Sequence, residues 1–193
     1  MERLHYTGIA SPIGTIWAAA TETGLFQVAF ARPYTEFLRS IKWRADAEVV
    51  EDPDRFNELR NMLKAYFEGE PVDFDLTFDL RGTEFQKAVW RAVHEIQYGR
   101  LSSYGRLAAA VGRPKAARAV GNAVGANPLG IVIPCHRVIR SDGSIGGFGG
   151  RPDLKRYFLS LEGVLPRTKD KGFELIEKEY PKMRKDLLRY FFE

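Results

Sequence analysis

The stretch Ile131-Val132-Ile133-Pro134-Cys135-His136-Arg137-Val138-Ile139 decides how this chain is interpreted. Its apolar start predicts a buried strand that delivers a cysteine, flanked by a proline, beside a histidine. Cys135 is the only cysteine among the 193 residues, so no disulfide forms within the chain. A lone cysteine is more often a small buried apolar residue than a reactive one. Its neighbours therefore have to decide between these two interpretations.

Those neighbours indicate a nucleophile. A thiolate attacks carbon well, but the thiol must first lose its proton to a base. His136 is adjacent in sequence, and neighbouring side chains seldom face each other, so we expect the proton to pass through a bridging water. The chain has only two other histidines, His5 and His94, which argues against a clustered structural zinc site. We expect no metal and no cofactor.

Helix signals precede this stretch. Thr83 and Gln86 form a capping-box pattern and predict a helix that begins directly after Thr83. Ser103 is expected to cap a short helix, and Pro114 to open the next one over residues 115–125. Two short helices joined by a tight turn resemble a helix-turn-helix, although an ordinary packed helix pair has the same pattern.

The first eighty residues have a different pattern, with strand signals and turn residues. The expected elements are a β-hairpin (13–20 and 25–30), two helices (about 37–41 and 56–66) and, over 72–80, a half-buried strand or an extended connector. The sequence thus predicts a mixed α/β (α+β) chain. Its expected parts are an α/β domain (1–79), a mostly helical domain (80–165) and a helical extension (166–193) without a catalytic role.

Charge also changes along the chain. Residues 1–80 contain 8 Lys and Arg against 14 Asp and Glu, a net charge of −6, whereas residues 81–165 contain 13 against 5, a net charge of +8. A basic second half is typical of a surface that neutralises phosphates, although charged faces are often only solvated. No apolar run approaches the roughly 20 residues needed to span a membrane, and no signal peptide is evident. We expect a cytoplasmic protein without a membrane partner.

Pro-Cys-His-Arg-Val at 134–138, after an isoleucine-rich run, closely resembles the active-site signature of the O6-alkylguanine-DNA alkyltransferases. The resemblance extends over about residues 83–163 and includes Ser103-Tyr104, the run 114–121, Asn127-Pro128 and Leu161-Glu162-Gly163. The first eighty residues match only in size and order, as the ribonuclease-H-like α/β domain of this family. The resemblance implies a monomeric DNA-repair protein that acts on double-stranded DNA. It would transfer an alkyl group from O6-alkylguanine, and from O4-alkylthymine, irreversibly and stoichiometrically to Cys135.

The resemblance also implies catalytic roles. Glu162 would orient His136, which would receive the thiol proton of Cys135 through water, as in a hydrolase triad. Asn127 would hold the turn around the active-site strand. Tyr104 would donate a proton or a hydrogen bond to the departing guanine, although a half-buried aromatic without a catalytic role is the alternative.

Further residues would bind DNA and the base. Because the sulfur cannot reach the alkyl carbon within the base stack, the base must leave the duplex. Arg118 would fill the gap, with its helix in the minor groove. The implied DNA-binding residues are Ser103, Lys115, Ala117, Arg118, Ala119, Asn122 and Ala123; the implied base-binding residues are Val138, Phe148, Gly149 and Gly150. Many members of the family have Tyr and then Ser or Ala where this chain has Phe148 and Gly149, so only a backbone N–H at Gly149 would contact O6.

Two rival functions fit parts of this pattern. Cysteine with histidine and glutamate also describes a cysteine hydrolase, which would turn over repeatedly. A non-catalytic DNA-binding module, such as the alkyltransferase-like proteins, would bind the lesion without repairing it. Those modules lack the cysteine that is present here as Cys135.

Overall fold

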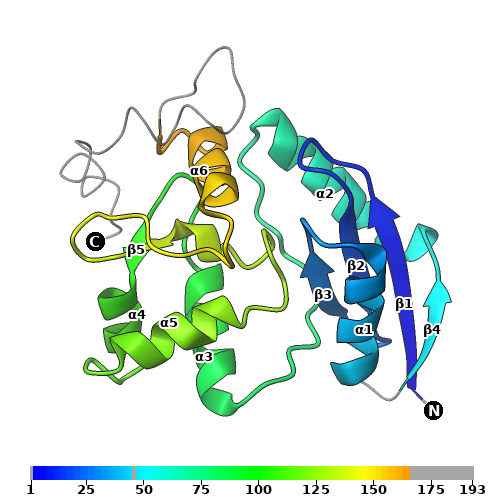
Figure 1. Cartoon of the computed structure of the whole chain (residues 1–193), viewed down its shortest axis with the longest axis horizontal. Helices are drawn as coiled ribbons and strands as arrows, with labels where there is room; N and C mark the ends of the chain where they lie inside the picture. The colour runs from blue at the N-terminus through cyan, green and yellow to red at the C-terminus, as the bar shows by residue number, and fades with distance from the viewer. Residues whose placement is uncertain (1, 45–46, 166–193) are drawn as a thin grey trace. The chain divides into compact units, whose positions relative to one another are not determined.

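The computed structural model describes residues 2–44 and 47–165, and Figure 1 shows the helices and strands that they form. The elements are β1 (Glu2–Ile9), β2 (Ile16–Ala20), β3 (Leu25–Ala29), α1 (Tyr34–Arg44), β4 (Ala47–Glu51), η1 (Asp54–Phe56), α2 (Asn57–Glu68), α3 (Glu84–His94), β5 (Ser102–Ser103), α4 (Tyr104–Ala110), α5 (Ala117–Gly125), η2 (Cys135–Arg137), β6 (Val138–Ile139) and α6 (Pro152–Leu161), where η marks a short 3-10 helix. The chain divides into two compact units. Of the described residues, one unit contains 2–44, 47–82 and 128–132, and the other contains 83–127 and 133–165.

The first unit is built on a sheet with the strand order β3-β2-β1-β4. Strand β1 pairs antiparallel with β2 and parallel with β4, and β2 pairs antiparallel with β3. The β2–β3 pair confirms the predicted hairpin, in which the Thr21 N–H donates to the Gly24 carbonyl at 2.9 Å. Helix α1 packs on the sheet through a buried cluster that includes Leu4, Phe26 and Phe37. None of the described helices is long and apolar enough to cross a membrane.

The sequence pattern did not predict β1 or β4. Both strands carry several polar residues, among them Glu2, Arg3 and His5 in β1, so neither has a clear apolar period. Strand β1 nevertheless lies between β2 and β4 and forms backbone hydrogen bonds along both edges. The pairing with neighbouring strands, which a local pattern does not contain, decides these two elements.

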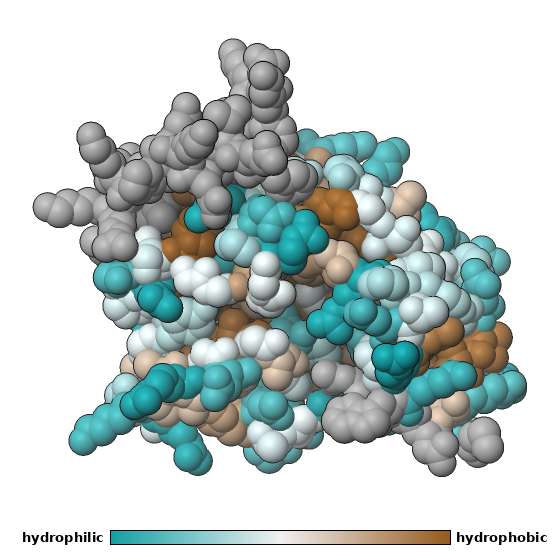
Figure 2. Space-filling view, in the orientation of Figure 1, coloured by the Kyte–Doolittle hydropathy of each residue, from teal (hydrophilic) through white to brown (hydrophobic). Residues whose placement is uncertain are grey.

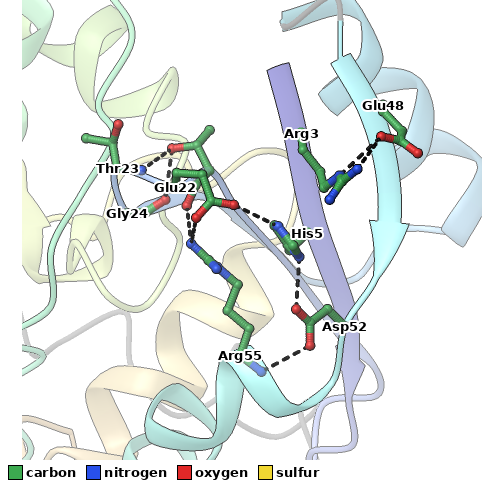
Figure 3. Close-up of polar contacts among 9 residues, drawn as sticks. Arg3, His5, Glu22, Thr23, Gly24, Glu48, Asp52 and Arg55 are labelled. Carbon is green, nitrogen blue, oxygen red and sulfur yellow. Dashed lines mark hydrogen bonds and ion pairs between the residues drawn. The ribbon is translucent and has the colours of Figure 1, made fainter. Parts of the chain in front are cut away.

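A surface network of charged groups joins three parts of this unit (Figure 3). His5 Nδ1 lies 2.9 Å from the Asp52 carboxylate and His5 Nε2 lies 3.1 Å from the Glu22 carboxylate. Arg55 donates to Glu22 at 3.1 Å and to the Thr21 carbonyl at 2.9 Å. The network therefore links β1, the turn between β2 and β3, and the start of η1.

Helix α2 and the segment after it also follow the sequence closely. The predicted helix over 56–66 is α2, and it ends at Gly69, whose φ of 89° is a left-handed conformation that favours glycine. The alternating run 72–80 is the extended connector, not a strand of the sheet. It joins β3 at one point only, where the Leu25 N–H donates to the Thr77 carbonyl at 2.8 Å and the Asp79 N–H donates to the Leu25 carbonyl at 2.9 Å.

The second unit is mainly helical, as predicted. The capping box before α3 is confirmed: Thr83 Oγ1 accepts from the Gln86 N–H at 3.2 Å, and Gln86 Oε1 accepts from the Thr83 N–H at 2.9 Å. Ser103 caps α4 by accepting from the Arg106 N–H at 3.2 Å. Helices α3, α4 and α5 pack against one another, and the indole N–H of Trp90 in α3 donates to the backbone carbonyl of α5 residue 123 at 2.7 Å.

The prediction that α5 begins at Lys115 is wrong, because the helix begins at Ala117. Pro114 and Lys115 instead form a tight turn, in which the Ala116 N–H donates to the Arg113 carbonyl at 2.8 Å. The fixed φ of proline suits the second position of such a turn as well as the first turn of a helix. The sequence signal was therefore compatible with both.

The predicted strand over 131–133 is also wrong. Only the preceding residues join the edge of the sheet in the first unit, where the Val28 N–H donates to the Pro128 carbonyl at 2.9 Å and the Gly130 N–H donates to the Val28 carbonyl at 3.0 Å. Ile131 then adopts a φ of 71°, which ends the extended path. The apolar residues are buried by packing, and a short apolar run does not distinguish packing from strand pairing.

Candidate active site

Cys135 is the first residue of η2, directly after the buried Pro134. The residue as a whole is partly exposed. Burial of the sulfur raises the pKa of the Cys135 thiol. A hydrogen bond from the Asn127 side chain and the positive charge of Lys155 act in the opposite direction and favour the thiolate.

Asn127, two residues beyond the end of α5, connects that helix to the cysteine turn. Its side-chain Nδ2 donates to the Ile133 carbonyl at 2.8 Å. The same carbonyl accepts from the Cys135 backbone N–H at 2.8 Å. The position of the sulfur is thus linked to the end of α5 through one amide side chain.

His136 and Glu162 form a buried pair. The imidazole is fully buried, and its Nε2 lies 2.6 Å from Glu162 Oε1. Burial alone would raise the pKa of Glu162, but the charges and hydrogen bonds of His136 and Arg137 outweigh it and hold this pKa at about 2. An ionised carboxylate only accepts hydrogen bonds, so Nε2 carries the hydrogen of the imidazole. Nδ1 is then the nitrogen that can receive a proton.

The protonation of His136 depends on competing effects. Burial lowers the pKa of His136, the Glu162 carboxylate raises it, and the positive charges of Arg137 and Lys155 lower it further. The net effect is a pKa below the ordinary value. His136 is therefore uncharged near neutral pH and can act as a base.

Arg137 and Lys155 are site residues to which the sequence reasoning gave no role. Arg137 donates to Glu162 through Nε and Nη2 at 3.0–3.2 Å. Lys155 of α6 is fully buried, and its Nζ donates to the Val138 carbonyl at 2.6 Å. Burial lowers the pKa of Lys155 to about 8. Arg137 lies in the cysteine motif at 134–138, which was a signal in the sequence, whereas Lys155 lies outside that motif and had no such signal.

Tyr104 is the first residue of α4 and is half-buried. Burial, followed by the negative charge of Cys135, raises the pKa of its hydroxyl. The hydroxyl therefore keeps its proton near neutral pH and can donate a hydrogen bond. It also faces the loop 141–150, because a Cβ built on Gly146 would lie 3.5 Å from Tyr104 Oη.

The predicted base-binding residues lie within this loop (Phe148, Gly149 and Gly150) and shortly before it (Val138). Val138 is buried in β6, and its carbonyl accepts from Lys155. The ring of Phe148 packs edge-on against Phe158, with centroids 6.1 Å apart. Gly149 and Gly150 are exposed and have φ values of 54° and 81°, a region that favours glycine over Ser or Ala.

The predicted DNA-binding residues differ in accessibility. Four of them lie exposed in α5 or in the turn before it: Lys115, Arg118, Ala119 and Asn122, with Ala117 partly exposed. In Figure 2, hydrophilic side chains over α4 and α5 lie next to residues of intermediate hydropathy. Ser103 is buried and uses its hydroxyl to cap α4. Ala123 is also buried, so its side chain does not reach the surface.

Comparison with known families covers both units. Residues 4–80 match the family model described as 6-O-methylguanine DNA methyltransferase, ribonuclease-like domain. Residues 84–164 match the model described as 6-O-methylguanine DNA methyltransferase, DNA binding domain. The chain belongs to the 6-O-methylguanine DNA methyltransferase family. The resemblance that the cysteine motif indicated, and the mixed α/β fold class, are confirmed.

Individual members of the family are similar over most of their length. The methylated-DNA–protein-cysteine methyltransferase of Methanosarcina acetivorans is 42% identical over 160 residues, which cover 83% of this chain and 99% of that protein. Its counterpart in Mycobacterium tuberculosis is 43% identical over 159 residues, 82% and 92% of the two chains. The crystal structure of Mycobacterium tuberculosis OGT in complex with DNA matches with a TM-score of 0.72 and 41% identity, over 82% and 92% of the two chains.

Membership in the methyltransferase family fixes the type of reaction. The protein is a DNA-repair transferase that moves an alkyl group from DNA to a cysteine of its own chain, once per molecule. Because the chain has one cysteine, Cys135 is the acceptor. The cysteine hydrolase is therefore no longer needed to explain the cysteine, histidine and glutamate of this site.

Proposed function

We propose that the protein repairs O6-alkylguanine, and also O4-alkylthymine, in double-stranded DNA after the damaged base has left the helix. The observation that carries this proposal is a partly exposed Cys135 next to an uncharged His136 that is bound to an ionised Glu162. This arrangement supports deprotonation of a thiol by a base whose orientation is fixed.

The proposed reaction is a displacement at the saturated alkyl carbon. The thiol proton of Cys135 passes through a water to His136 Nδ1, and the thiolate attacks the saturated alkyl carbon from the side opposite O6. The sulfur–carbon bond forms as the carbon–O6 bond breaks, and the electron pair of that bond stays with guanine. Tyr104, whose raised pKa keeps it protonated, donates a proton or hydrogen bond to the departing base. No step breaks the resulting thioether, so each molecule acts once.

For the DNA, we propose that α5 lies in the minor groove and that Arg118 occupies the space of the extruded base. The exposed positions of Lys115, Arg118, Ala119 and Asn122 and the partial exposure of Ala117 support this. Small side chains let a helix approach the sugar–phosphate backbone closely, and lysine neutralises phosphate. Ser103 and Ala123 would contribute by capping and packing the two helices.

For the base, we propose contacts from backbone groups of Val138, Phe148, Gly149 and Gly150. The Val138 carbonyl already accepts from Lys155, but a carbonyl oxygen has two lone pairs and can accept a second hydrogen bond from an amino group of the base. The left-handed backbone of Gly149 and Gly150 supports a close approach of their N–H groups to the ligand.

Several properties stay predictions from the sequence: the cytoplasmic location, the monomeric state, the domain limits at 79 and 165, and the absence of a cofactor. The predicted helical extension 166–193 lies outside the described residues.

The proposal is tested with O6-benzylguanine and mass spectrometry. We expect one benzyl group on the protein, located on Cys135 by peptide mapping, and none on Cys135→Ser. A duplex containing O6-methylguanine should be repaired one molecule per protein and then no further. An unchanged protein mass, or repeated turnover, would contradict the proposal.

A further inference from the structure

We infer that Arg137 is a positioning residue of this alkyl transfer: by binding the Glu162 carboxylate, it keeps His136 uncharged and therefore able to accept the proton of Cys135. This inference rests on the proposed function, in which His136 is the base. It assigns to Arg137 an electrostatic task, in addition to a structural one, and it predicts a specific change in pH dependence.

The geometry places Arg137 and His136 on the same carboxylate. Arg137 Nε lies 3.2 Å from Glu162 Oε1 and 3.0 Å from Oε2, and Nη2 lies 3.0 Å from Oε1. His136 Nε2 binds that same Oε1 at 2.6 Å. Consecutive residues of η2 thus share one buried acceptor.

The guanidinium is held firmly in this position. Its Nη1 donates to the Ile96 carbonyl, and the group lies over the ring of Tyr98, 5.8 Å from the centroid. Arg137 is 5% exposed, so its charge acts in a region that water screens poorly. Two protein groups other than Glu162 therefore fix the guanidinium, which in turn fixes the carboxylate.

The charge balance explains the consequence for His136. A carboxylate 2.6 Å from an imidazole favours the imidazolium, and an imidazolium has no free lone pair with which to accept a proton. Arg137 compensates the charge of Glu162. The effect of burying the imidazole therefore outweighs that of the carboxylate, and the pKa of His136 stays low. Lys155 on α6 acts in the same direction. Cys135 directly precedes His136 in the chain, and its thiolate would favour the imidazolium only after the proton has moved.

The test compares full-length Arg137→Met with the native chain. We expect the His136 pKa to rise, because the compensating charge is gone. Benzyl transfer to Cys135 should then be slowed by about tenfold or more near pH 6, and it should recover toward the native rate as the pH rises and His136 loses its proton. The rate is followed by protein mass, and the protonation of His136 by NMR, where only three histidines contribute.

Two further variants keep the inference falsifiable if Arg137→Met folds poorly. The double variant Arg137→Met with Glu162→Gln removes both charges, so the pKa of its His136, followed by NMR, should fall back toward the native value. Arg137→Lys keeps the positive charge but loses the bidentate contact with Glu162. The rate of benzyl transfer should therefore be lower, but its pH profile should keep the native shape. The exposed Arg100, replaced by Met, is the matched control for loss of one arginine.

A rate reduced by the same factor at every pH, with an unchanged His136 titration, would overturn the inference and leave a structural role only. A His136 pKa that stays raised in the double variant would do the same. Failure of the proposed function itself gives a different result, because the native chain would then not be benzylated at all.

Discussion

Each of the two units contains a histidine bound to a carboxylate, two carboxylates in the first unit and one in the second, and an arginine that binds one of these carboxylates. In the first unit, His5 lies between Asp52 and Glu22, at a surface where the Glu22 side chain is 72% exposed (Figure 3). In the second unit, His136 and Glu162 have fully buried side chains. The residue types are the same, but water screens the first group and not the second. Because of this difference in burial, the His5 network links surface segments, whereas the His136 network sets the proton affinity of the imidazole.

The largest effect is expected when the buried carboxylate is removed. Glu162→Ala leaves Arg137 without its carboxylate and His136 without its acceptor, and loss of one member of a buried ion pair costs about 3–5 kcal/mol. We expect a fall of that size in the free energy of unfolding, measured by urea denaturation, together with loss of benzyl transfer. A fall in the free energy of unfolding no larger than that for a surface ion pair would show that burial makes no difference between the Glu162 group and the Glu22 group.

An intermediate effect is expected at Lys155. In Lys155→Met, the thiol of Cys135 loses a favourable charge, so its pKa should rise and transfer near pH 7 should slow by about tenfold. The chain has one cysteine, so the thiolate absorbance near 240 nm reports on Cys135 alone. The exposed Lys64, replaced by Met, is the control.

The same variant tests the pH dependence of stability. The pKa of Lys155 is lowered from 10.5 to about 8 in the folded protein, so between these values the unfolded chain binds more protons than the folded one. Native stability should therefore rise with pH through this window, by up to about 3 kcal/mol. Lys155→Met should lack this rise. An identical pH dependence in the two proteins would contradict the burial of a charged lysine.

The smallest effect is expected in the surface network. His5→Gln should lower the free energy of unfolding by no more than about 1 kcal/mol, because exposed ion pairs contribute little. Benzyl transfer should keep its native rate and pH profile. A shift in the pH profile of transfer would instead show that the surface network influences the active site.

Local signals predicted much of the second unit. The capping box at Thr83 and Gln86 and the cap at Ser103 each act within a few residues, and both are present. Sequence signals that are compatible with two different local structures were less reliable predictors. Pro114 fits a turn as well as a helix start, and the apolar run 131–133 fits a packed turn as well as a strand.

By itself, the sequence determined the family and the nucleophile, because the motif at 134–138 and the single cysteine are properties of the chain alone. Only the tertiary structure decided which charges surround that cysteine. Arg137 reaches Glu162 across 25 residues, and Lys155 reaches the Val138 carbonyl across 17. Burial of a charge and its compensation depend on groups that folding brings together, and no periodicity of the chain encodes them.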